Sequence, residues 1–144
     1  MCFASRQEGI NLEWTHLRDD PLLVILPPDY DLRGRDSLHI RCLQGMDFLM
    51  PSLGFHLDIM RALGDVQPNI RETQVSDSVI ISMVEHGLGV SVLSELVLKG
   101  RRDNVVAVPM DPPAVRELGI AVRSKKELRP MARRFITEAR EVLE

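Results

Sequence analysis

The sequence has few cysteines and no long apolar run, and each shortage excludes a class of protein. Its two cysteines, Cys2 and Cys42, form no CxxC pair, so we expect free thiols rather than a disulfide framework or a cysteine metal site. The longest apolar run, residues 22–26, is far shorter than the roughly 18–20 residues of a membrane helix. Residues 1–10 lack the basic start and apolar middle of a signal peptide. These features predict a cytoplasmic protein with no membrane partner.

Composition and charge limit the function further. The chain has 144 residues, 44% hydrophobic and 27% charged, which is typical of one folded domain or one lobe of a larger domain. Its formal net charge of −3 predicts no general attraction to nucleic acid. Positive charge is concentrated near the end, because residues 101–144 hold 10 of the 18 lysines and arginines. Any contact with DNA would therefore be local or made by residues outside this sequence.

Strand-like and helix-like patterns alternate along the chain. The apolar run 22–26 ends at Pro27 and is typical of a strand buried on both faces. A short strand at 48–50 ends at Pro51, and a helix is predicted to start just after Ser52 and to end at Gly64. The other predicted strands are 70–75, 90–93, 105–108 (stopping before Pro109) and 118–122, and the other predicted helices are 38–43 capped by Ser37, 78–86 capped by Asp77, 95–99 and 129–143. This alternation predicts an α/β sandwich with a mostly parallel sheet.

No catalytic or metal-binding motif is present. The four histidines, His16, His39, His56 and His86, show no HExxH or other metal-ligand spacing, and there is no GxSxG nucleophile elbow. The segment 87–89 (Gly-Leu-Gly) follows a predicted helix and precedes a strand, the reverse of a dinucleotide-binding loop. We therefore predict no catalytic residue, no metal and no cofactor, and a protein that is not an enzyme.

One basic cluster has two interpretations. Its members are Arg123, Lys125, Lys126, Arg129, Arg133 and Arg134. A solvated helix face is the favoured reading because no aromatic residue is interleaved, and a contact with a DNA backbone is the alternative.

Two strand-to-helix junctions are the best candidates for a binding site. Met50–Phe55 joins a predicted strand to a helix start, and Thr73–Asp77 does the same with more polar groups. In an open parallel sheet such junctions meet at the carboxyl edge, where the unpaired amides of helix first turns attract anionic or polar ligands. Helix capping alone would also explain Ser52 and Asp77, so capping remains the alternative to a ligand site.

The order of segments resembles the effector-binding domain of LysR-type transcriptional regulators. Five stretches carry the resemblance: 22–32 (a strand, then Pro-Pro-Asp-Tyr-Asp-Leu), 47–51 (Asp-Phe-Leu-Met-Pro), 87–95 (Gly-Leu-Gly-Val-Ser-Val-Leu-Ser-Glu), 116–122 (Arg-Glu-Leu-Gly-Ile-Ala-Val) and the helix 129–136. The sequence departs from the family pattern at Tyr30, usually histidine, and at Ser94, usually proline.

The resemblance implies a three-layer α/β domain like the type II periplasmic binding proteins, in which two lobes hold the effector between them. Residues 28–118 would form the second lobe, 18–27 and 117–123 the two crossing strands, and 129–143 a helix of an otherwise missing first lobe. The helix-turn-helix domain has no counterpart here, so DNA would be bound only through that missing part.

The resemblance also implies a small, anionic organic effector. The positions that match the family's ligand contacts are Leu26, Pro27, Met50, Pro51, Ser52, Leu53, Gly54, Phe55, Gln74, Val75, Ser76 and Asp77. Without its first lobe the last helix would expose its apolar stripe, which predicts a homodimer, with exchange of the C-terminal helices as one route to pairing. The alternatives are a solute-binding protein or a small hydrolase on the same scaffold, and a nonfunctional remnant of a regulator.

Overall fold

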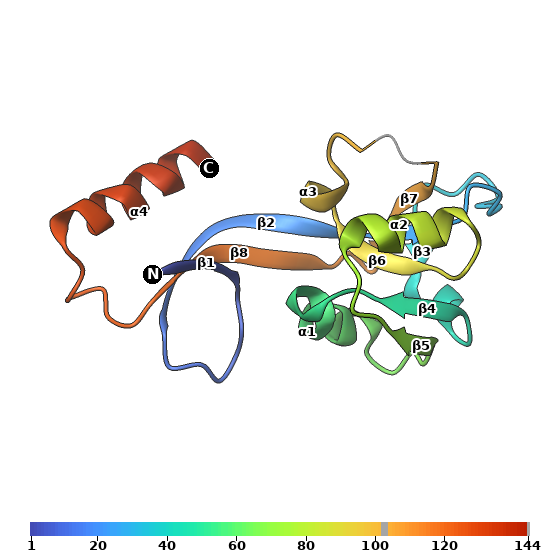
Figure 1. Ribbon diagram of the computed structural model, residues 1–144, viewed down its shortest axis with the longest axis horizontal. Helices are drawn as coiled ribbons and strands as arrows, with labels where there is room; N and C mark the ends of the chain where they lie inside the picture. The colour runs from blue at the N-terminus through green and yellow to red at the C-terminus, as the bar shows by residue number, and fades with distance from the viewer. Residues whose placement is uncertain (102–103, 144) are drawn as a thin grey trace. The chain divides into compact units, whose positions relative to one another are not determined.

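The computed structural model describes residues 1–101 and 104–143, without the side chain of Leu53 (Figure 1). The chain forms two compact units: Met1–Asp20 with Arg116–Glu144, here called unit 1, and Pro21–Val115, here called unit 2. Two strands, β2 (Glu13–Leu26) and β8 (Val115–Val122), have residues in both units. The α/β class predicted from the sequence is confirmed.

The core of unit 2 is built on the second half of β2. Val24, Ile25 and Leu26 are completely buried, as expected for an apolar run with no polar alternation. In this half, β2 pairs antiparallel with β6 (Ser91–Ser94) and with β7 (Val106–Asp111). The predicted strand was therefore correct in place but much too short at its beginning.

Strand pairing in unit 2 is mixed rather than mostly parallel. β4 (Asp47–Met50) and β5 (Asn69–Glu72) are parallel, as are β3 (Leu38–His39) and β7. The prediction of mostly parallel pairing fails because β2 runs opposite to both β6 and β7. β7 also continues through Pro109, where the sequence predicted its end. β3 pairs with β7 only at Met110 and Asp111, so β2 is the only described strand that pairs with β7 at Pro109. Proline has no backbone N–H to donate, and its place in β7 is tolerated because only one neighbouring strand pairs with it there.

The helices of unit 2 begin and end close to their predicted positions. They are α1 (Leu53–Leu63), α2 (Asp77–Glu85) and α3 (Glu95–Leu98), with a 3-10 turn, η1, at Ile40–Leu43. Gly64 ends α1 with a positive φ of 57°, as predicted. The predicted caps were wrong twice: Ser76, one residue before Asp77, caps α2, and the His39 ring rather than Ser37 accepts the η1 amide. None of the described helices is long and apolar enough to cross a membrane.

Two glycines close the turn from α2 into β6. Gly87 has a φ of 75°, a conformation that costs glycine little. Gly89 lies so close to β4 that a Cβ atom there would be 2.9 Å from the backbone oxygen of Asp47. Val90 then forms a parallel bridge with Phe48, which fixes the direction of β6 relative to β4. The segment 87–89 is therefore a packing element, as its position between a helix and a strand indicated.

Unit 1 has its own small apolar cluster. β1 (Cys2–Ser5), which the sequence did not predict, pairs antiparallel with β8, and α4 (Pro130–Leu143) follows (Figure 1). Leu17, Ile120 and Val122 are buried, and Ile136 and Ala139 of α4 pack against them. α4 begins one residue after its predicted start.

Candidate functional site

The candidate site lies where β4 and β5 end. Met50, the last residue of β4, is the register partner of Glu72, the last residue of β5. Because the two strands are parallel, the segments that follow them leave the sheet at the same edge. Each segment leads directly into a helix, α1 after Ser52 and α2 after Ser76.

A hollow of about 420 Å³ opens between the two segments. Its lining residues are Pro51, Ser52, Gly54, His56, Glu72, Thr73 and Gln74. Four of these, Pro51, Ser52, Gly54 and Gln74, belong to the set predicted from the sequence. Residues more than 20 positions apart in the chain are therefore brought together at the predicted edge.

Neither helix start uses its serine hydroxyl as a cap. Ser52 caps α1 and Ser76 caps α2, yet neither side chain accepts a hydrogen bond from its helix, and both serines are exposed. N-cap serines normally use the hydroxyl to satisfy a first-turn amide. The first turns of both helices therefore begin at the same edge of the sheet, where their backbone amides can bind a polar or anionic group.

Thr73 fixes the geometry of the hollow. Its hydroxyl donates to the backbone oxygen of Met50 at 2.8 Å, which ties the end of one junction to the other. Thr73, Glu72 and His56 were missed by the sequence analysis. The helical spacing from Ser52 to His56 is a signal that would have identified His56, since residues four apart lie on one helix face.

The other predicted junction residues are not among the described residues that line the hollow. Met50 and Phe55 are buried, and Val75 packs on the core. Asp77 is half-buried, and one of its carboxylate oxygens is buried without a hydrogen-bond partner among the described residues. The side chain of Leu53 lies outside the described part of the chain.

Leu26 and Pro27, which the resemblance gave as ligand contacts on a crossing strand, are not among the described lining residues of this hollow. β2 is antiparallel to β6, with Leu22 opposite Ser94 and Ile25 opposite Ser91. β2 therefore runs away from the carboxyl ends of the parallel strands, and Leu26, which is fully buried, lies toward their amino ends. On this strand Leu22 is the residue beside the end of β6.

Three side chains in unit 1 have metal-ligand spacing. Ligand atoms of His16, Asp19 and Glu117 lie within 4.8 Å of one another on β2 and β8. Existing contacts account for the arrangement, because His16 Nε2 is 2.8 Å from Asp19 Oδ1 and Arg6 donates to Glu117 at 3.3 Å. These three residues are therefore not proposed as a metal site.

Comparison with known proteins decides the family. A family model of the LysR substrate binding domain matches residues 4–144. The chain belongs to the LysR substrate-binding domain family. The resemblance noted in the sequence, and the fold class it implied, are thereby confirmed.

Curated relatives of this LysR domain are transcriptional regulators. The chain is 29% identical over 137 residues to the HTH-type transcriptional regulator YvbU of Bacillus subtilis, covering 91% of the chain and 46% of the relative. It is 26% identical over 138 residues to the Hca operon transcriptional activator HcaR of Escherichia coli, covering 92% of the chain and 47% of the relative. The chain thus spans about half the length of these relatives.

Solved structures show the same fold. The regulatory domain of CcmR from Synechocystis PCC6803, in complex with 2-PG, superposes with a TM-score of 0.80 at 25% identity, covering 99% of this chain and 72% of that one. The effector binding domain of QuiR, in complex with shikimate, gives a TM-score of 0.81 at 19% identity, covering 98% and 70%. Both neighbours were solved in complex with a ligand.

Proposed function

We propose that this LysR domain senses a small organic effector for a transcriptional regulator and is not an enzyme. The observation that carries the proposal is the meeting of Ser52 and Gln74, from separate strand-to-helix junctions, in one hollow at the carboxyl edge of β4 and β5. The relatives named as HTH-type regulators support a DNA-binding partner domain as the receiver of the signal. Such a regulator acts on DNA, so we place its work in the cytoplasm.

The proposed effector is a small organic anion. Two helix starts, of α1 and α2, direct their positive ends toward the edge, which favours a negatively charged group. The hydroxyls of Ser52 and Ser76 and the exposed Gln74 add neutral hydrogen-bonding groups. The 2-PG and shikimate complexes of structural neighbours support a ligand of this size.

We further propose that unit 2 is the second lobe of the family's effector domain, with 18–27 and 117–123 as its crossing strands and 129–143 as a helix of the first lobe. In this arrangement the hollow is one wall of the effector site, and Leu26 and Pro27 lie outside it. Coupling to DNA requires the effector to bind one arrangement of the protein more tightly than another.

A homodimer formed through α4 is the proposed assembly. Met131 and Val142 of this helix are 85% and 82% exposed, and Phe135 is also exposed. Phe135 meets Phe3 edge-to-face with ring centroids 6.0 Å apart, so aromatic side chains of β1 and α4 extend the same apolar surface. Exposed apolar patches of this kind drive association, with exchange of α4 between copies as one route.

Amide chemical shifts on the full chain test the effector site. Shikimate is added to the isotope-labelled protein, and shifts are expected at the first-turn amides of α1 and α2 and at Gln74. The Gln74→Ala variant is expected to weaken binding, whereas Gln67→Ala, an exchange outside the lining residues, is expected to leave it unchanged. Shifts confined to other segments would contradict the proposed site, and a panel of short-chain carboxylates extends the test beyond shikimate.

A further inference from the structure

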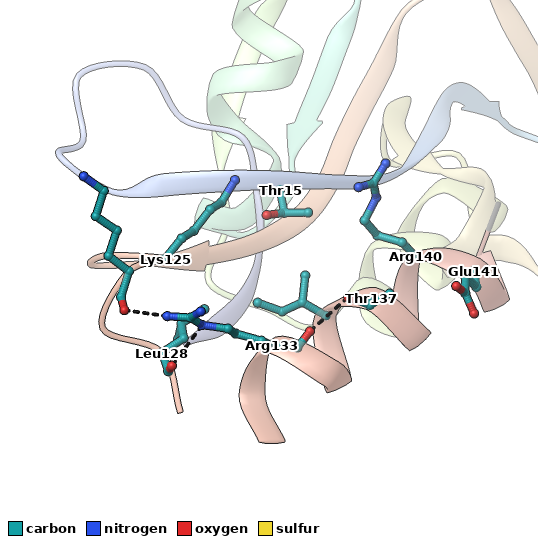
Figure 2. Close-up of a pocket in the computed structure, with 9 residues that line it drawn as sticks. Thr15, Lys125, Leu128, Arg133, Thr137, Arg140 and Glu141 are labelled. Carbon is teal, nitrogen blue, oxygen red and sulfur yellow. Dashed lines mark hydrogen bonds between the residues drawn. The ribbon is translucent and has the colours of Figure 1, made fainter. Parts of the chain in front are cut away.

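A second and larger hollow lies entirely within unit 1 (Figure 2). Its volume is about 690 Å³, and it is formed by β2, the segment after β8 and one face of α4. We call it the basic hollow. Its lining residues are Thr15, Lys125, Lys126, Leu128, Arg133, Ile136, Thr137, Arg140 and Glu141.

Positive charge dominates this lining. Four of the described lining residues carry a positive charge, Lys125, Lys126, Arg133 and Arg140, against the single carboxylate of Glu141. The chain as a whole has a net charge of −3, so the hollow is a local reversal of the protein's field. Fields of one sign focused in a concave site raise the local concentration of ions of the opposite sign.

Two of these cations are held by neutral oxygens. The Arg133 guanidinium donates to the backbone oxygens of Lys126, at 2.6 Å, and Leu128, at 3.1 Å, and the Lys125 ammonium donates to the backbone oxygen of Trp14 at 3.1 Å. A carbonyl orients a cation without neutralising it. By contrast Arg134, one residue further along α4 and outside the lining, is paired with Glu138 at 2.7 Å.

The hollow also offers apolar surface and hydroxyls. Leu128 and Ile136 line it and pack against the buried cluster of unit 1. Figure 2 shows Thr15 on β2 and the three labelled residues Arg133, Thr137 and Arg140 along α4, with the Arg140 side chain extending toward β2. A ligand that matches both kinds of surface has an anionic head and a short apolar body.

We propose that the basic hollow binds a small organic carboxylate, at a site separate from the hollow at the ends of β4 and β5. Lys125, Lys126 and Arg140 supply charge to the carboxylate, and Leu128 and Ile136 contact the hydrocarbon part. Three residues of the basic cluster of the sequence, Lys125, Lys126 and Arg133, line this hollow.

The composition of the lining argues against nucleic acid as the ligand. None of the described lining residues is aromatic, whereas single-stranded nucleic acids are usually held by bases stacked on aromatic rings. A phosphate backbone would also offer no apolar surface for Leu128 and Ile136 to contact. A short duplex is therefore included in the experiment as a competing partner.

Calorimetric titration of the full chain tests the proposal with three probes: hexanoate, hexan-1-ol and inorganic phosphate. Hexanoate combines the charge and the apolar body, so it is expected to bind at least about tenfold more tightly than either of the other probes. Tenfold is about the loss of affinity when one charge-assisted hydrogen bond is removed. The affinity for hexanoate is also expected to fall as salt is added, because exposed charges are screened.

Matched variants locate the binding. Lys126→Gln and Arg140→Gln each remove one lining charge and are expected to weaken hexanoate binding about tenfold. Arg134→Gln makes the same exchange on α4 outside the hollow and is expected to change it less than twofold. Thermal unfolding of each variant shows whether it folds. The variant Arg140→Lys keeps the positive charge and is expected to retain most of the binding.

Several results would overturn the proposal. They are equal binding of hexanoate and hexan-1-ol, an equal loss in Arg134→Gln and Arg140→Gln, or displacement of hexanoate by a short DNA duplex that binds more tightly. No detectable binding of hexanoate at concentrations of about 10 mM would also overturn the proposal, since a dissociation constant above that concentration is too weak for a functional site.

Discussion

Arg116 donates a hydrogen bond to Asp20 at 2.8 Å, and this ion pair is withdrawn from water. The Asp20 side chain is completely buried and that of Arg116 is 14% exposed. Arg116 lies at the start of β8 and Asp20 on β2, so the pair joins residues 96 positions apart. A buried carboxylate needs such a partner, because an uncompensated charge in the interior is costly.

We predict that Arg116→Gln destabilises unit 1 by about 3–5 kcal/mol, because it removes a cation that is paired with the buried Asp20 carboxylate. Urea unfolding followed by the fluorescence of Trp14, the only tryptophan, measures the loss. Arg6→Gln is the control, since Arg6 pairs with Glu117 at the surface and its loss is expected to cost less than about 1 kcal/mol. Similar losses in the two variants would refute the assignment of Arg116 and Asp20 as a buried pair.

A second prediction concerns Gly89. A Cβ atom there would lie 2.9 Å from the backbone oxygen of Asp47 and 3.1 Å from the Leu49 side chain. We expect Gly89→Ala to destabilise unit 2 by about 1–3 kcal/mol, because backbone must move to make room. Gly54→Ala is the matched control: a Cβ atom at Gly54 meets nothing within 4 Å, and alanine favours the helix. A neutral Gly89→Ala by chemical unfolding would show that the turn packs less closely than the structure indicates.

Much of the fold could be predicted because its signals are local. Neighbouring residues suffice to recognise the apolar run that ends at Leu26 and the glycine that follows α1. The same holds for each of the two strand-to-helix junctions at the site. Ser52 and Gln74 were brought together correctly because consecutive parallel strands share a carboxyl edge.

The failures have a non-local cause. Leu26 and Pro27 were assigned to the ligand site by family resemblance, and they do not line the hollow because β2 pairs antiparallel with β6 and runs away from its edge. The basic hollow was also not predicted from the sequence. Lys125 and Arg140 meet at one hollow only through the packing of α4.

A third prediction separates binding from stability at the effector site. Ser52 makes no cap hydrogen bond, so Ser52→Ala is expected to change stability by less than about 0.5 kcal/mol. The same variant is expected to weaken effector binding by about threefold to tenfold, because the proposed site loses one of its hydroxyls. Chemical unfolding and the shikimate titration measure the two effects.

The control for this prediction is Ser94→Ala. Ser94 is buried and its hydroxyl accepts from the Val97 amide at 3.4 Å, so its loss is expected to cost about 1 kcal/mol of stability. A destabilised Ser52→Ala with unchanged binding would mean that Ser52 serves α1 and not a ligand.

The last prediction concerns the exposed apolar surface of α4. If this surface forms the homodimer, the double variant Met131→Glu with Val142→Glu should be monomeric by light scattering at micromolar concentration, because each change would bury a carboxylate against apolar side chains. Leu57→Glu is the control, since Leu57 is an exposed apolar residue of α1, and it should remain dimeric. A wild-type chain that is already monomeric under these conditions, or a control that dissociates equally, would exclude α4 as the dimer surface.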